Sequence, residues 1–231
     1  MRFMALLRKE LRESLPWILL GCILLLGVGA LIIRVYTVSG MYTWQYQNMK
    51  PGEAVDSYHL VSYSILNNIN IWLICISVGL GLVLALRQFG LAFLTRTWPF
   101  MIHRSASKTI IIVSKLAAAG IVLYVCLGVI WTILYKYASQ PRTFISPPPF
   151  RAFIDGWLFI TLGAVTYLGT TLSVLSTSRW YTTRIFGLVV AGIVVGLASI
   201  ESSRPEACIL ILVSIVMLLS QIFYTFLTRE F

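Results

Sequence analysis

The side chains that could take part in binding or catalysis concentrate in one short segment of an otherwise apolar chain. From Thr97 to Lys115 the sequence reads TWPFMIHRSASKTIIIVSK, with one histidine, one arginine, two lysines and five hydroxyl residues. Aromatic residues such as Trp98 and Phe100 beside basic residues are suited to docking on a partner protein. The same basic residues could instead hold the segment inside the cell and against anionic lipid. The residues alone leave both interpretations open.

The spacing of reactive residues argues against an enzyme. The two histidines, His59 and His103, fall on opposite sides of the membrane in the topology predicted below. No HExxH, GxSxG or GxxxxGK[ST] motif is present, so the patterns of a zinc protease, an esterase and a P-loop ATPase are absent. The four cysteines have no CxxC spacing, and we expect them to be small buried apolar residues. We therefore predict no catalytic, cofactor-binding or metal-binding residue in this chain.

The elements that must position this segment are membrane helices. The chain is 58% hydrophobic and only 11% charged, well below the charge content of a soluble domain. A run of about 20 apolar residues spans the hydrocarbon core as a helix, and backbone groups in lipid must be satisfied within the segment. We predict an all-α fold with six transmembrane helices, at approximately 16–33, 69–86, 116–135, 157–175, 185–200 and 207–227. The fifth is the shortest, and whether it is continuous, broken or re-entrant stays open.

The distribution of Lys and Arg predicts the orientation of these spans. With the N-terminus inside, the outer segments hold only Arg34, Lys50, Lys136, Arg142, Arg151 and Arg204. The other twelve basic residues then lie on the cytoplasmic side, which places both termini there by the positive-inside rule. This bias accounts for the formal charge of +10 without a nucleic-acid partner.

The first 15 residues, MRFMALLRKELRESL, have the pattern of an amphipathic helix that lies in the lipid headgroup layer. One face would carry Phe3, Met4, Leu7, Leu11 and Leu15, and the other Arg8, Lys9, Arg12 and Glu13. Pro16 is expected to end this helix, so that residues 1–15 form an interfacial element and residues 16–231 the transmembrane domain. A secretory signal peptide is the weaker alternative, because acidic residues interrupt the basic start.

Other signals concern the spans themselves. No charged residue lies well inside a predicted span, which argues against an ion-coupled carrier. Ser107 is expected to cap the helix that becomes the third span. Small residues that permit close helix approach occur in spans two, four and five, namely Gly79, Gly81, Gly163, Gly169, Gly192 and Gly196. Whether they pack within one subunit or between two stays open.

Two segments together resemble the permease subunits of ABC-2 type ABC transporters. In that family a KE-containing elbow helix precedes span one, and the cytoplasmic loop between spans two and three reads approximately TWPFLLHRPASRxxIxxxK. Here the corresponding segments are LLRKELRES and TWPFMIHRSASKTIIIVSK. The matching positions in the loop are Thr97, Trp98, Pro99, Phe100, His103, Arg104, Ala106, Ser107 and Lys115. Ser105 replaces a proline, Lys108 replaces an arginine, and Gln88 stands where many members have an acidic residue.

The resemblance implies an exporter in the bacterial plasma (inner) membrane. Two permease subunits, identical or not, would pair with two cytoplasmic ATP-binding subunits, which bind ATP and Mg²⁺. A coupling loop over residues 87–115 would dock on the ATPase, with Trp98 and Phe100 as anchors. The residues implied in this contact are Arg96, Thr97, Trp98, Pro99, Phe100, His103, Arg104, Ser107 and Lys108, and the elbow residues are Arg8, Lys9, Glu10 and Arg12. The alternative is a non-transporting membrane scaffold or an assembly partner of a membrane enzyme. The substrate is not implied.

Overall fold

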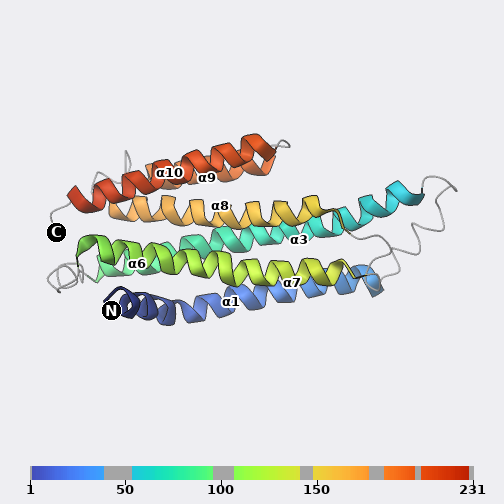
Figure 1. Ribbon diagram of the computed structural model, residues 1–231, viewed down its shortest axis with the longest axis horizontal. Coiled ribbons are helices and arrows are strands. Elements are labelled where there is room, and N and C mark those ends of the chain that lie inside the picture. Colours follow the sequence, from blue (N-terminus) through green and yellow to red (C-terminus); the bar gives the residue numbers. More distant parts are fainter. Residues whose placement is uncertain are drawn as a thin grey trace.

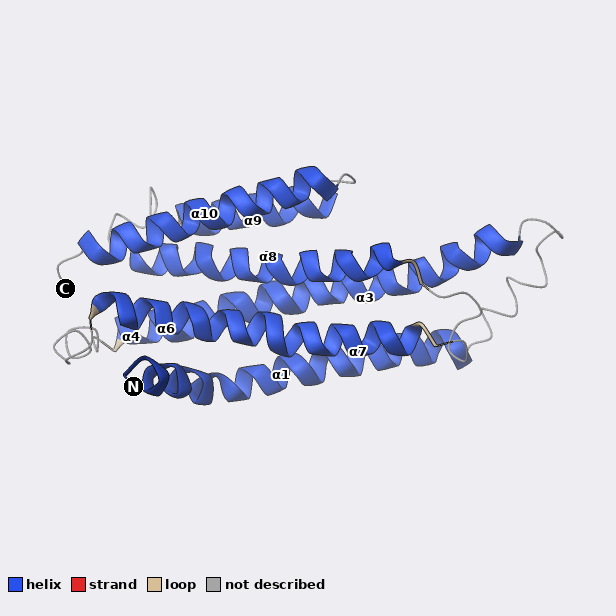
Figure 2. Cartoon of the chain, in the orientation of Figure 1, coloured by secondary structure: helices blue, strands red, loops and turns tan. Residues whose placement is uncertain are grey.

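The computed structural model describes residues 2–38, 54–95, 107–140, 148–176, 185–200 and 204–228. These residues form helices and contain no strand, which confirms the all-α prediction for the described part of the chain (Figure 2). The helices are α1 (Arg2–Val38), α3 (Ala54–Ala85), α4 (Leu91–Leu94), α6 (Lys108–Gly120), α7 (Gly128–Ala138), α8 (Phe150–Leu175), α9 (Phe186–Ile200) and α10 (Arg204–Thr228). Two π-helical turns, η1 (Leu86–Gly90) and η2 (Ile121–Leu127), join α3 to α4 and α6 to α7. The described residues therefore make six helical rods.

The rods lie side by side along the long axis of the molecule and alternate in direction (Figure 1). The start of α1 and the end of α10 lie at the same end of the bundle, together with the end of α4 and the start of α6 (Figure 1). We call this the N/C end. An even number of alternating rods returns the chain to the side from which it started, and so both termini share one end.

Five of the described helices are long and apolar enough to cross a membrane, as expected for a multi-pass membrane protein. They are Phe3–Val35, Leu66–Gly90, Lys108–Ala138, Phe150–Leu175 and Pro205–Leu227. The predicted fifth span is the continuous 15-residue helix α9. At about 1.5 Å per residue it is ~22 Å long, short of the ~30 Å hydrocarbon core. Five of the six predicted spans therefore have spanning length in the described residues.

Pro16 does not end the first helix, contrary to the sequence-based expectation. α1 runs without interruption from Arg2 to Val38 with Pro16 inside it. One stripe of the helix stays in contact with the bundle along this length, because Glu10 and Ser14 are buried in line with Leu25 and Ile33. Continuous packing offsets the backbone hydrogen bond that the proline removes. The first 15 residues thus continue the first rod.

Glycines allow α3, α8 and α9 to approach closely. A methyl group added at Gly81 would overlap the carbonyl oxygen of Gly163, and one at Gly163 would lie 2.6 Å from the carbonyl oxygen of Ser77. Ser77 Oγ donates to the carbonyl oxygen of Phe159 at 2.9 Å across the same contact. Gly169 packs in the same way on Gly187 of α9. These glycines therefore serve packing within one chain.

The other glycines and the cysteines behave differently. Apart from the adjoining part of its own helix, no described atom lies within 4 Å of a methyl group added at Gly79, Gly192 or Gly196. The cysteines are free thiols, but Cys75 and Cys208 are exposed on the bundle surface, so the prediction that all four are buried in the protein is wrong. Both lie on spanning helices, where the outward face of the bundle meets lipid.

Candidate functional site

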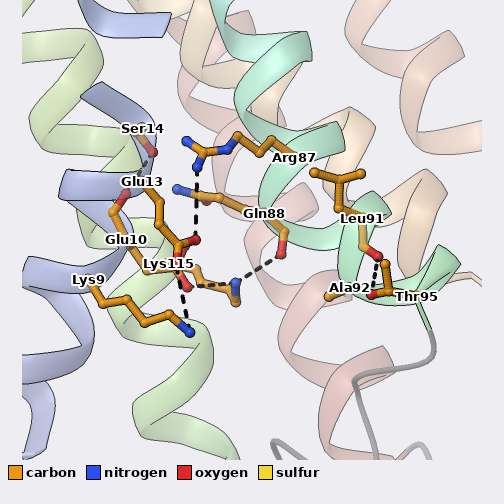
Figure 3. Close-up of a pocket in the computed structure, with 10 residues that line it drawn as sticks. All are labelled: Lys9, Glu10, Glu13, Ser14, Arg87, Gln88, Leu91, Ala92, Thr95 and Lys115. Carbon is orange, nitrogen blue, oxygen red and sulfur yellow. Dashed lines mark hydrogen bonds and ion pairs between the residues drawn. The ribbon is translucent and has the colours of Figure 1, made fainter. Parts of the chain in front are cut away.

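A buried ion pair joins three helical rods near the N/C end. Lys115 Nζ on α6 lies 2.8 Å from Glu10 Oε1 on α1, and the two side chains are only 5% and 10% exposed. The same ammonium donates to the backbone carbonyl oxygen of Gln88 in η1, at 2.9 Å (Figure 3). A buried charge is tolerated when it is both paired and hydrogen-bonded. Lys115 satisfies both conditions, and it links α1, α6 and the end of α3.

The π-helical turn η1 supplies the carbonyl oxygen that accepts the hydrogen bond from Lys115. π-turns occur as short bulges within α-helices and are frequent at functional sites. Here the turn buries Gln88 and Phe89, and the Gln88 carbonyl oxygen meets Lys115. The Phe89 ring centroid lies 5.5 Å from Lys115 Nζ, within the range of a cation–π interaction. On the other side, Ser14 Oγ donates to the Glu10 carbonyl oxygen at 2.8 Å.

Tyr167 brings the fourth rod, α8, into the site. Its hydroxyl donates to Gln88 Oε1 at 2.6 Å and lies 3.4 Å from the Lys115 carbonyl oxygen. Tyr167 and Gln88 are both buried. Glu10, Lys115, Gln88 and Tyr167 therefore form one connected polar cluster inside an apolar bundle, and we call it the Lys115 cluster.

A polar pocket of about 210 Å³ lies beside the Lys115 cluster. Its lining residues are Lys9, Glu10, Glu13, Ser14, Arg87, Gln88, Leu91, Ala92, Thr95 and Lys115 (Figure 3). Glu13 lies 3.7 Å from Lys9 Nζ and 3.9 Å from Arg87 Nη2. Both distances exceed that of a hydrogen bond, so these are loose ion pairs, unlike that of Glu10.

The predicted elbow residues divide between this site and the surface. Glu10 enters the Lys115 cluster and Lys9 lines the pocket, whereas Arg8 and Arg12 are exposed. Ser107 caps α6 as predicted, because its Oγ accepts a hydrogen bond from the Ile110 backbone N–H. Lys108, the first residue of α6, is half-buried. The remaining predicted coupling residues, Arg96, Thr97, Trp98, Pro99, Phe100, His103 and Arg104, lie outside the described residues.

The expected loop from Arg87 to Lys115 is shorter at both ends. Helical residues extend to Leu94, and the next helix starts at Lys108, so Lys115 lies inside a helix of spanning length. The sequence predicts no charged residue well inside a span, whereas Lys115 is buried at the eighth position of this 31-residue helix, one residue before the predicted third span. The signal was present in the sequence, because Lys115 shares a helix face with the apolar residues Ile111, Ile112, Ala118, Ala119 and Val122. Gln88 and Tyr167 are uncharged, so their positions in the sequence did not indicate that they belong to a buried polar cluster.

Among the residues that the structure describes, no group of three or more His, Cys, Asp or Glu is placed to hold a metal ion. Comparison of the chain with protein-family models, with curated proteins and with solved structures found no match.

Proposed function

We propose that this chain is the permease subunit of an ABC-2 type ABC transporter. The observation that carries the proposal is the contact between Glu10 and Lys115. Glu10 belongs to the KE pair of the first helix, and Lys115 is the last residue of the TWPFMIHRSASKTIIIVSK segment. These are the two segments on which the resemblance rests. Their ends meet although 105 positions separate them.

The proposed mechanism couples ATP use in a partner to the membrane helices. The basic segment 96–106 would dock on a cytoplasmic ATP-binding subunit, which holds ATP and Mg²⁺. This segment connects α4 to α6, and Lys115 on α6 is bonded to both α1 and η1. A displacement of the segment would therefore move α6 and, through the Lys115 side chain, the rods that contain α1 and η1. Binding of ATP must favour one arrangement of the rods through such differential contacts.

The charge distribution supports a cytoplasmic N/C end. Outward transport and a bacterial plasma membrane are proposed from the resemblance alone. The basic residues Arg8, Lys9, Arg12, Arg87, Lys108 and Lys115 belong to the helix ends that meet there. Basic residues favour the cytoplasmic side. A second permease subunit, identical or different, would complete the pathway.

A pull-down in mild detergent tests the proposal. The tagged wild-type chain is expected to co-purify with an ATP-binding subunit and to stimulate its ATPase activity. Trp98→Ala combined with Phe100→Ala should leave the chain in the membrane but abolish both. The control is Phe150→Ala, which removes an exposed aromatic side chain at the start of α8, away from the N/C end. Full co-purification and stimulation with the double variant would refute the coupling role. Recovery of a membrane enzyme in place of an ATPase would favour the scaffold alternative.

A further inference from the structure

Two residues that line the pocket beside the Lys115 cluster each carry a hydrogen-bond donor that no described residue satisfies. The two donors are Gln88 Nε2 and Arg87 Nη1, both shielded from solvent. The Gln88 side chain is anchored at its other atom, Oε1, by Tyr167. Its amide nitrogen points across the pocket toward α1 (Figure 3). Gln88 as a whole is only 4% exposed. Buried donors without acceptors are costly, and an acceptor supplied by another molecule in the pocket would remove this cost.

The charges that line the pocket indicate which acceptor is missing. The Glu10 carboxylate is bonded directly to Lys115, and the Glu13 carboxylate is too far from Arg87 for a hydrogen bond. Among the described residues that line the pocket, three are cationic (Lys9, Arg87 and Lys115) and two are anionic (Glu10 and Glu13). An oxyanion would satisfy both free donors and balance the excess charge. A guanidinium beside an amide N–H is well suited to phosphate oxygens.

The surroundings of the pocket indicate where this phosphate comes from. Leu91 lines the pocket and is exposed, and Leu86 and Leu94 on the same rod are also exposed. These apolar side chains lie at the end of a membrane-spanning helix, at the level where charged residues begin. Lipid phosphates occupy this boundary, and their acyl chains would lie along the exposed leucines. The pocket volume of about 210 Å³ is several times the ~30 Å³ that one water occupies in the liquid.

We propose that this pocket binds the phosphate group of a membrane phospholipid. Arg87 Nη1 and Gln88 Nε2 donate to the phosphate oxygens, and Lys9 lies at the rim. The bound lipid fills the space between α1 and η1, next to the Glu10–Lys115 ion pair. The inference depends on the chain being embedded in a membrane and not on transport, so it stands or falls separately from the proposed function.

Native mass spectrometry of the full chain released from lipid nanodiscs tests the proposal. The probes are phosphatidylglycerol and diacylglycerol, which carry similar acyl chains but differ in the phosphate. We expect the wild-type chain to retain phosphatidylglycerol and not diacylglycerol. Arg87→Gln should lower retention about tenfold, as expected for loss of a charged hydrogen bond. Gln88→Glu should also lower it, because this variant keeps an acceptor for Tyr167 but puts a carboxylate where the amide donor was.

Arg12→Gln is the matched control, because Arg12 is an exposed arginine on the same part of α1 that does not line the pocket. It should retain phosphatidylglycerol like the wild type. Equal retention by the wild type and Arg87→Gln would overturn the proposal, and so would an equal loss in Arg12→Gln, which would indicate only general attraction of lipid to basic residues. Competition with millimolar inorganic phosphate separates the two sources of oxyanion. Displacement of the lipid by inorganic phosphate would show that the pocket takes the free ion, and the lipid assignment would be wrong.

Discussion

The ammonium group of Lys115 and the carboxylate of Glu10 lie 2.8 Å apart in the interior of the bundle, although 105 residues separate them in the chain. Each charge alone would be expensive to bury, and each is stabilised by the other. The ion pair therefore links α1 to α6. Its energetic contribution is visible only when the two partners are changed separately and together.

Replacing one member of this pair should destabilise the protein strongly. Lys115→Met leaves Glu10 buried without a partner and should lower the free energy of unfolding by about 3 kcal/mol or more. Lys115→Met combined with Glu10→Gln removes both charges and should recover much of that loss. Tryptophan fluorescence during denaturation in detergent measures these changes. A double variant as unstable as the sum of the two single variants would contradict the pairing.

Lys9→Met is the control for this experiment. Lys9 forms the looser pair with Glu13, and its side chain is 56% exposed. Exposed ion pairs four residues apart on a helix contribute about 0.3–0.5 kcal/mol. The stability of Lys9→Met should therefore be close to that of the wild type.

The hydrogen bond between Tyr167 and Gln88 should be measurable as a coupling energy. Tyr167→Phe removes the buried hydroxyl and leaves Gln88 Oε1 without its donor, which should cost about 1–3 kcal/mol. Gln88→Met should lose the same bond from the other side. The two changes together should cost less than their sum, because they share one interaction. A double-mutant cycle tests this expectation, and strict additivity would show that the bond contributes nothing.

The glycines of α8 and α9 should respond oppositely to the same change. Gly163→Ala places a methyl group 2.6 Å from the Ser77 carbonyl oxygen, and the resulting strain should cost about 1–3 kcal/mol. Gly192→Ala meets no described atom within 4 Å beyond the adjoining part of its own helix, and alanine is favoured over glycine in a helix by about 0.5–1 kcal/mol. Thermal unfolding of the two variants in detergent should show a lower Tm for the first only. A similar fall for both would indicate that Gly192 is packed against another molecule.

The two ends of the bundle should be labelled from opposite sides of the membrane. In a chain whose four cysteines are replaced by alanine, Gln140→Cys should react with a membrane-impermeant maleimide added to intact cells. Arg12→Cys should react only after the membrane is made permeable. Gln140 and Arg12 are both exposed, and they belong to opposite ends of the bundle. Labelling of Arg12→Cys in intact cells would invert the proposed orientation.

Much of the fold follows from local features of the sequence. Long apolar runs predict helices because each helix satisfies its own backbone hydrogen bonds in lipid. Ser107 predicts the start of α6 because a capping side chain contacts N–H groups only a few residues away. Residue type permits close approach at Gly163 and Gly169, but it equally permits it at Gly192 and Gly196, where none occurs in the described chain. The apolar runs and the helix cap depend on neighbours along the chain and can be recognised without the tertiary structure.

The sequence by itself thus determined the apolar helices and the two segments that carry the resemblance, although α3, α6 and α8 begin well before the predicted spans. Only the tertiary structure decided that α1 continues through Pro16, that Lys115 is buried and bonded to Glu10, and that Gln88 and Tyr167 complete their cluster. The physical reason is that the cost of burying a charge or interrupting a helix depends on the groups that surround it. Here those groups come from four different rods.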